Sequence, residues 1–182
     1  MAKLVSKTYG DALFDIALEK NAVDEFAAEV TAVAQAFSEN PDLMKLLEHP
    51  KIVKEEKIKF IEDVFKGRIS DEMTGFLVLV VDKGRQRELT DIFEYFTDRV
   101  REHKNIGVAH VSTPVEMSDA QKEQVLKKLL ATTKYTDFEM HYKVDESLIG
   151  GMVIRIGDRV VDSSIKTKLE DIARSLKNVQ LA

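Results

Sequence analysis

The sequence changes its character within one stretch, His103-Lys-Asn-Ile-Gly-Val-Ala-His-Val-Ser-Thr113. Before it, apolar residues recur with the 3.6-residue period of helices, whereas after it the period of 2 that is typical of strands is mixed with helical runs. The charge balance changes at the same place, because residues 1–105 carry 16 basic and 21 acidic side chains and residues 106–182 carry 11 of each. We therefore expect an α+β fold overall, with an N-terminal domain over 1–105 and a C-terminal domain over 106–182.

The N-terminal domain is predicted to be an all-α bundle of about six helices. Asn40 and Pro41 are a predicted cap and first-turn proline, Ser70 is a second predicted cap, and Gly67 and Gly84 are expected to end helices. Apolar spacing places the helices at 7–20, 23–37, 41–48, 51–66, 70–83 and 89–100.

The C-terminal domain is predicted to be a small α+β unit. A strand is expected over 106–113, followed by a helix that opens with a capping box from Ser118 to Gln121. Strict alternation of apolar and polar residues from Phe138 to Val144 predicts a half-buried strand. Gly157-Asp158 lies between two apolar runs and predicts a two-residue hairpin. A final helix carries four regularly spaced apolar residues, Ile165, Leu169, Ile172 and Leu176.

Composition excludes several classes of protein. The chain has 182 residues, no Cys and a formal net charge of −5, so disulfides and thiolate metal sites are absent and a general nucleic-acid binder is disfavoured. The longest apolar run, Phe76 to Val81, is far shorter than the ~18 residues of a membrane span. No secretory signal or transit peptide is visible, which favours a bacterial chain.

No constellation of residues predicts an enzyme. The four His residues show no metal-ligand spacing, and the acidic pairs are adjacent in sequence, so their side chains diverge by about 100° on a helix. Gly150-Gly151 lacks the following Lys-Ser/Thr of a phosphate loop and precedes a strand, so a tight backbone approach is the better interpretation. We expect no catalytic, cofactor-binding or metal-binding residues.

Two predicted helices carry more apolar surface than a bundle needs. In the helix over 7–20, apolar side chains cover about 240° of the circumference, whereas packing against one side of a bundle requires roughly 100°. The run from Phe76 to Val81 covers every direction. Each helix is either central in the bundle or has an external partner, and together they would suit a groove that receives an amphipathic helix.

A resemblance to a known family comes from three stretches. The longest is Val144-Asp-Glu-Ser-Leu-Ile-Gly-Gly-Met-Val-Ile-Arg-Ile-Gly-Asp-Arg-Val-Val-Asp-Ser-Ser-Ile-Lys-Thr-Lys-Leu169. Tyr9-Gly-Asp-Ala-Leu-Phe14 and Asp82-Lys-Gly-Arg-Gln-Arg-Glu-Leu89 agree with it. In order and spacing they resemble the delta subunit of bacterial F-type ATP synthase, the counterpart of the mitochondrial oligomycin-sensitivity-conferring protein.

The resemblance implies a non-catalytic stator subunit that ties the α3β3 head to the b-subunit peripheral stalk, so that proton-driven rotation yields ATP. It implies that the N-terminal domain binds the N-terminal helix of an α subunit between its first and fifth helices, and that the C-terminal domain meets the b subunits. It also implies a peripheral location on the cytoplasmic side of the cell membrane, with no cofactor. The residues carried over to the α-subunit site are Tyr9, Ala12, Leu13, Ile16, Phe76, Leu79 and Val80.

Two alternatives stay open from the sequence. One is a helical adaptor or regulator outside ATP synthase, and the other is a small enzyme with an unrecognised carboxylate or His site. Co-purification with the α and β subunits would distinguish the adaptor, and a turnover screen would distinguish the enzyme.

Overall fold

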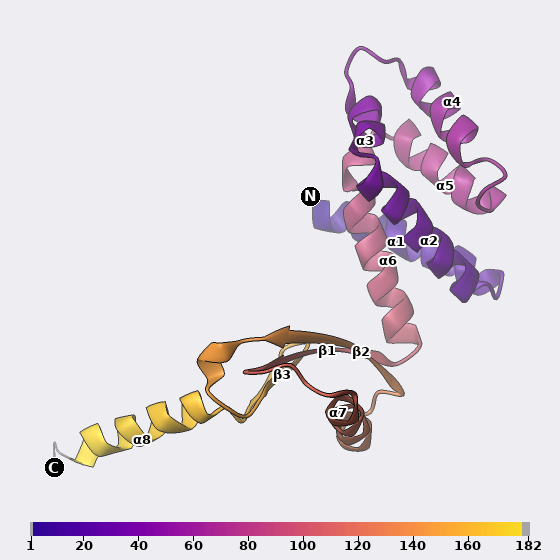
Figure 1. Cartoon of the computed structure of the whole chain (residues 1–182). Helices are drawn as coiled ribbons and strands as arrows, with labels where there is room; N and C mark the ends of the chain where they lie inside the picture. Colours follow the sequence, from indigo (N-terminus) through magenta and orange to yellow (C-terminus); the bar gives the residue numbers. More distant parts are fainter. Residues whose placement is uncertain (1, 180–182) are drawn as a thin grey trace. The chain divides into compact units, whose positions relative to one another are not determined.

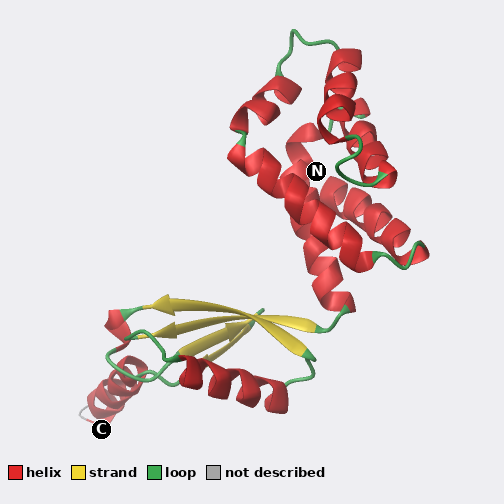
Figure 2. Ribbon diagram, turned by 45° about the vertical axis from the view of Figure 1, so that its right-hand side comes forward, coloured by secondary structure: helices red, strands yellow, loops and turns green. Residues whose placement is uncertain are grey.

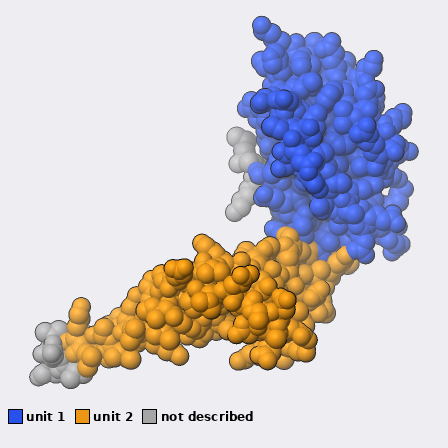
Figure 3. All heavy atoms as spheres, viewed as in Figure 1, with its two compact units in different colours: residues 1–100 blue, residues 101–182 orange. Residues whose placement is uncertain are grey.

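The computed structural model describes residues 2–179 and divides into two compact units, residues 1–100 and 101–182 (Figures 1 and 3). The expected junction lay a few residues later. The guanidinium of Arg101 hydrogen bonds Glu139 at 2.9 Å, and the carbonyl of Asn105 accepts the N–H of Thr136. These bonds attach residues 101–105 to the second unit.

Unit 1 is helical throughout its described part. Its elements are α1 (Ala2–Glu19), α2 (Val23–Glu39), α3 (Pro41–Glu48), α4 (Lys54–Phe65), α5 (Asp71–Asp82), the short 3-10 helix η1 (Gln86–Glu88) and α6 (Leu89–His103), whose last turn belongs to unit 2. One apolar core joins all six α-helices, and its fully buried members include Leu13, Leu47, Ile61, Leu77 and Phe96. Burial of these side chains, at about 1.5–3 kcal/mol each, is what holds short helices of modest propensity together.

The predicted helices are found, although α1 begins at Ala2 rather than at residue 7, α4 begins at Lys54 rather than at residue 51, and α6 continues to His103. The hydroxyl of Ser70 accepts the N–H of Met73 and caps α5, and Gly84, with φ of +67°, follows its end, so both predictions are confirmed. Asn40 and Pro41 occupy the N-cap and first-turn positions of α3 as predicted, but the Asn40 side chain does not cap α3, because its amide donates to the carbonyl of Ala36 at the end of α2.

Unit 2 contains a four-stranded sheet in the order β2-β1-β3-β4. The strands are β1 (Ile106–Thr113), β2 (Asp137–Val144), β3 (Val153–Ile156) and β4 (Arg159–Asp162). β1 and β2 are parallel and joined through α7 (Asp119–Thr132), whereas β3 is antiparallel to β1 and to β4. The predicted hairpin is confirmed, since Ile156 pairs with Arg159 across Gly157-Asp158. The mixture of helices and sheet makes the chain an α+β protein.

One face of this sheet is covered by α7 (Figure 2). Val125 and Leu129 of α7 pack on Ala109, Val111 and Phe138. The capping box between Ser118 and Gln121 opens this helix as predicted. The expected half-burial of β2 is only partly right, because Phe138 is buried but Tyr142 and Val144 are 39% and 50% exposed. β2 is an edge strand, and at its far end Lys122 of α7 lies over the Tyr142 ring, 5.5 Å from its centroid, without burying it.

The last helix, α8 (Ile165–Val179), follows β4. Its N-terminus adjoins the 3-10 helix η2 (Glu146–Leu148). Within residues 2–179, no helix is both long and apolar enough to cross a bilayer.

Candidate functional site

The helices α1 and α5, which the sequence singled out, are neighbours in unit 1. The rings of Tyr9 and Phe76 meet edge to face with centroids 6.4 Å apart, and the ammonium of Lys20 lies 2.5 Å from a carboxylate oxygen of Glu72. The hydrogen bond from Lys20 lowers the pKa of Glu72, and the same bond raises the pKa of Lys20. Exposed residues of both helices lie beside these contacts.

The seven residues proposed for this site separate into two groups. Leu13 and Val80 are fully buried and Phe76 is 5% exposed, so these three side chains belong to the core of unit 1. The other four are reachable from solvent: Tyr9 and Ile16 are half-buried, Ala12 is exposed and Leu79 is 46% exposed.

Gly75 of α5 belongs to the same surface, although the sequence analysis overlooked it. It is exposed in the middle of a helix, and a Cβ placed on it would meet no atom within 4 Å. Internal packing therefore does not require glycine here, while glycine costs about 1 kcal/mol relative to alanine within a helix. A glycine inside the helical pattern of α5 was the sequence signal that could have drawn attention to this position. We call Tyr9, Ala12, Ile16, Gly75 and Leu79 the α1–α5 surface.

Two of the three family stretches have structural roles in unit 1. A Cβ on Gly10 would overlap the ring of Tyr95 on α6, so this glycine allows α1 and α6 to pack closely. In the second stretch, the Gln86 amide donates to the carbonyl of Leu47 at the end of α3, and Lys54 of α4 pairs with Asp82 at 2.6 Å. These contacts fix the ends of α3 and α5.

The third stretch builds the junction between β4 and α8. One carboxylate oxygen of Asp162 accepts the N–H of Ser164, the other accepts the hydroxyl of Thr167, and Ser164 caps the helix through the N–H of Thr167. The bonds from Ser164 and Thr167 lower the pKa of Asp162. Gly151 has φ of +78°, and a side chain there would overlap the carbonyl of Ser163, which agrees with the predicted tight backbone approach. The direction in which α8 leaves the sheet is therefore fixed.

Unit 2 also holds a cleft beside α7. Its volume is about 800 Å³, and its walls include Val125 and Lys128 of α7 with Met152, Ile154 and Val161 of the sheet. The lining is mainly apolar.

Two of the four His residues come together, which the sequence does not reveal. His110 and His141 stack on paired strands with centroids 4.9 Å apart, and Glu139 lies 3.0 Å from His141 Nε2. Among residues 2–179, no three His, Cys, Asp or Glu side chains are placed to hold a metal ion together.

The chain is thus an α+β protein of two units with exposed apolar residues on helix faces. The comparisons with known proteins identify the family. The model of the ATP synthase delta (OSCP) subunit matches residues 5–176, and the chain belongs to this family.

Two bacterial ATP synthase delta subunits align with all or nearly all of this chain. ATP synthase subunit delta of Lachnoclostridium phytofermentans is 60% identical over 100% of both chains, and that of Desulforamulus reducens is 37% identical over 94% of each. In a cryo-EM structure of the Toxoplasma gondii mitochondrial ATP synthase hexamer, one chain superimposes with a TM-score of 0.71, covering 94% of this chain and 96% of that one. At 18% identity, that match shows the shared fold.

Family membership decides between the functions left open by the sequence. The chain is a structural, non-catalytic subunit of the ATP synthase peripheral stalk, the component that links the F1 head to the stator.

Proposed function

We propose that the two units hold different partners. Unit 1, as a six-helix bundle, binds the N-terminal helix of an α subunit on the α1–α5 surface, and unit 2 holds the b subunits of the peripheral stalk. The chain is then a peripheral component on the cytoplasmic side of the cell membrane. It keeps the α3β3 head from turning with the rotor.

Gly75 is the observation that carries the α-subunit site. An incoming helix can lie closest to α5 where α5 has no side chain, with Leu79 one turn further along the helix and Ala12 and Ile16 on the facing helix. Small residues at the centre of a contact let two helices approach closely, and the larger apolar residues around them then become buried.

The chemistry of this surface suits a stator. Torque acts on the contact at every turnover, so slow dissociation matters more than fast association. An apolar contact provides this with little dependence on salt, whereas exposed ion pairs contribute little. We expect nanomolar affinity, about −12 kcal/mol, shared between the two units.

The test is a calorimetric titration of the full chain with a synthetic peptide of the α subunit's N-terminal helix. We expect tight one-to-one binding by the wild type and at least a hundredfold loss with Gly75→Leu. Leucine is a better helix former than glycine, so the helicity of the variant is expected to be retained.

Ser38→Leu is the matched control, because it adds the same side chain on an exposed position of α2. Equal peptide binding by Gly75→Leu and Ser38→Leu would rule out the α1–α5 surface. No binding by folded wild-type chain would rule out the peptide as the partner.

A further inference from the structure

α8 carries an apolar stripe that no other part of the described chain covers. Its four stripe residues are all exposed, Ile165 by 43%, Leu169 by 52%, Ile172 by 56% and Leu176 by 64%. Their spacing of four, three and four keeps them on one face for about 17 Å. Because Asp162 and Ser164 fix the start of the helix, this stripe is held in a preformed position.

A fifth exposed apolar residue, Ile149, lies close in the chain to the residue that contacts the start of this stripe. It lies just after η2 and is 63% exposed. The next residue, Gly150, accepts the backbone N–H of Ile165 through its carbonyl, and its Cα faces the Ile165 side chain. Because Ile149 directly precedes the residue that Ile165 contacts, we group it with the stripe as the α8 ridge: Ile149, Ile165, Leu169, Ile172 and Leu176.

The backbone at Ile149 is strained. Its φ is +65° and its ψ is −43°, and the N–H of Gly150 bonds the carbonyl of Leu148 at 2.7 Å. This is a classic γ-turn, which is rare and strained, and a β-branched side chain at positive φ makes it less favourable still. The free chain therefore exposes an apolar residue and also strains its backbone, a combination that is typical of a position selected for binding.

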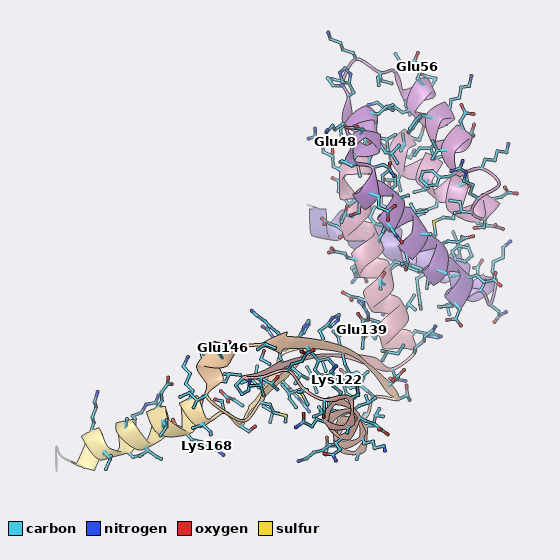
Figure 4. All side chains as sticks on the ribbon, in the orientation of Figure 1. Glu48, Glu56, Lys122, Glu139, Glu146 and Lys168 are labelled. Carbon is cyan, nitrogen blue, oxygen red and sulfur yellow. The ribbon has the colours of Figure 1, made fainter. Side chains whose placement is uncertain are left out.

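The charges beside the ridge indicate what covers it. By 100° steps, Lys168 lies about 70° from the middle of the stripe on one side and Lys166 about 90° on the other, whereas Glu170 and Asp171 each lie about 130° away. Figure 4 labels Lys168 on α8. A basic margin on both sides complements a helix whose own apolar stripe is flanked by Asp and Glu. A membrane surface is less suited, because the stripe has no aromatic residue and the helix carries two acids.

We propose that the α8 ridge receives an amphipathic helix with acidic flanks, and that Ile149 is its anchor residue. The inference rests on the proposed role of unit 2 in holding the stalk, and it names the part of unit 2 that makes the contact. Binding buries Ile149 and gives the strained turn a compensating contact. The exposed, strained conformation of Ile149 therefore costs less free energy in the complex than in the free chain.

The experiment measures thermal stability and binding of the full chain, with the soluble part of the b subunit from the same synthase as the probe. Ile149→Gly is expected to raise Tm by about 2–4 °C and to weaken b-subunit binding at least tenfold. A structural role for Ile149 would instead lower Tm, so an unchanged or lowered Tm overturns the strain argument.

Leu169→Asp and Val161→Asp separate the ridge from the cleft beside α7. Both replace an exposed apolar residue, and Val161 lines the cleft. We expect at least a hundredfold loss with the first and less than threefold with the second. The reverse result would place the partner in the cleft and overturn the proposal.

Lys168→Glu and Arg174→Glu test the charge of the partner, since they change net charge equally and Arg174 lies opposite the stripe. Lys168→Glu is expected to slow association of the b subunit about threefold, and this effect should become smaller at high salt. The association rate of Arg174→Glu should equal that of the wild type. Tighter binding by Lys168→Glu would mean a basic partner. Capture by phosphatidylglycerol vesicles, abolished by Leu169→Asp while b-subunit binding persists, would mean a membrane.

The two proposals fail in different ways. If wild-type chain does not bind the b subunit at all, the stalk role of unit 2 is wrong. If wild-type chain binds and both Ile149→Gly and Leu169→Asp bind equally well, the stalk role stands and the α8 ridge is wrong.

Discussion

The phenol of Tyr95 donates a hydrogen bond to the carboxylate of Asp11 across 2.9 Å and thereby joins α6 to α1. The same carboxylate lies 3.3 Å from the guanidinium of Arg99, which is placed over the ring of Phe14. Gly10 provides the space in which the Tyr95 ring lies. Gly10 and Asp11 of the Tyr-Gly-Asp stretch therefore form the junction between α1 and α6.

Gly10→Ala is expected to destabilise the chain by about 1–2 kcal/mol. Overpacking against Tyr95 costs about 1–3 kcal/mol, and the better helix propensity of alanine offsets up to about 1 kcal/mol of it. Urea unfolding at pH 7 measures the difference. Gly75→Ala is the matched control, because its Cβ meets nothing, and it should stabilise the chain by about 1 kcal/mol. Equal effects at the two positions would contradict the packing role of Gly10.

Whether the sequence predicts a structural feature depends on how far apart along the chain the interacting residues lie. Caps at Ser70 and Ser118 and the Gly157-Asp158 hairpin are decided by residues a few positions apart, and all three are confirmed. Asn40 has the predicted position at the start of α3, but its side chain bonds the preceding helix through the carbonyl of Ala36 and does not cap α3.

Features that depend on distant residues were beyond the sequence. The wheel of the first helix identifies surplus apolar surface but does not assign Leu13 to the core and Ala12 to solvent, because that choice depends on where α5 and α6 pack. The same holds for β2, where the alternation continues to Val144 although Tyr142 and Val144 stay 39% and 50% exposed. The exposure of α8 was likewise hidden, since an amphipathic pattern is the same whether its partner is internal or another protein.

Gly151→Ala and Gly67→Ala separate backbone conformation from close contact. The two glycines have φ of +78° and +77°, but only at Gly151 would the new methyl overlap a backbone carbonyl, that of Ser163. We expect a loss of about 1–2 kcal/mol at Gly67 from conformation alone. At Gly151 we expect about 2–5 kcal/mol, since overpacking adds to it. Denaturant unfolding provides both values, and similar losses would mean that the backbone of unit 2 relaxes around residue 151.

Asp162→Asn is expected to change how stability depends on pH. The bonds from Ser164 and Thr167 lower the pKa of Asp162 from its usual 3.8. A carboxyl whose pKa is lower in the folded chain stabilises it at pH values above the unfolded pKa, and that contribution is lost as pH falls through the folded pKa. The variant should therefore be less stable at pH 7 and should lose less stability between pH 5 and pH 3.

Urea unfolding at several pH values measures this effect, with circular dichroism as the signal. Asp158→Asn is a charge-matched control in the hairpin turn. If Asp162→Asn and wild type give parallel curves down to pH 3, the cap of α8 does not depend on the Asp162 carboxylate.

Leu13 and Leu79 provide the sharpest separation of core from surface, because one substitution applies to both. Leu13 is fully buried and Leu79 is 46% exposed. Leu13→Ala should cost about 2–5 kcal/mol of stability through the cavity it leaves, and Leu79→Ala less than about 1 kcal/mol. The order reverses for binding of the α-subunit peptide, where Leu79→Ala should lose about tenfold in affinity. Leu79→Asp and Ala12→Asp should abolish binding while the chain stays folded, and retained binding by both would mean that the α1–α5 surface has no partner helix.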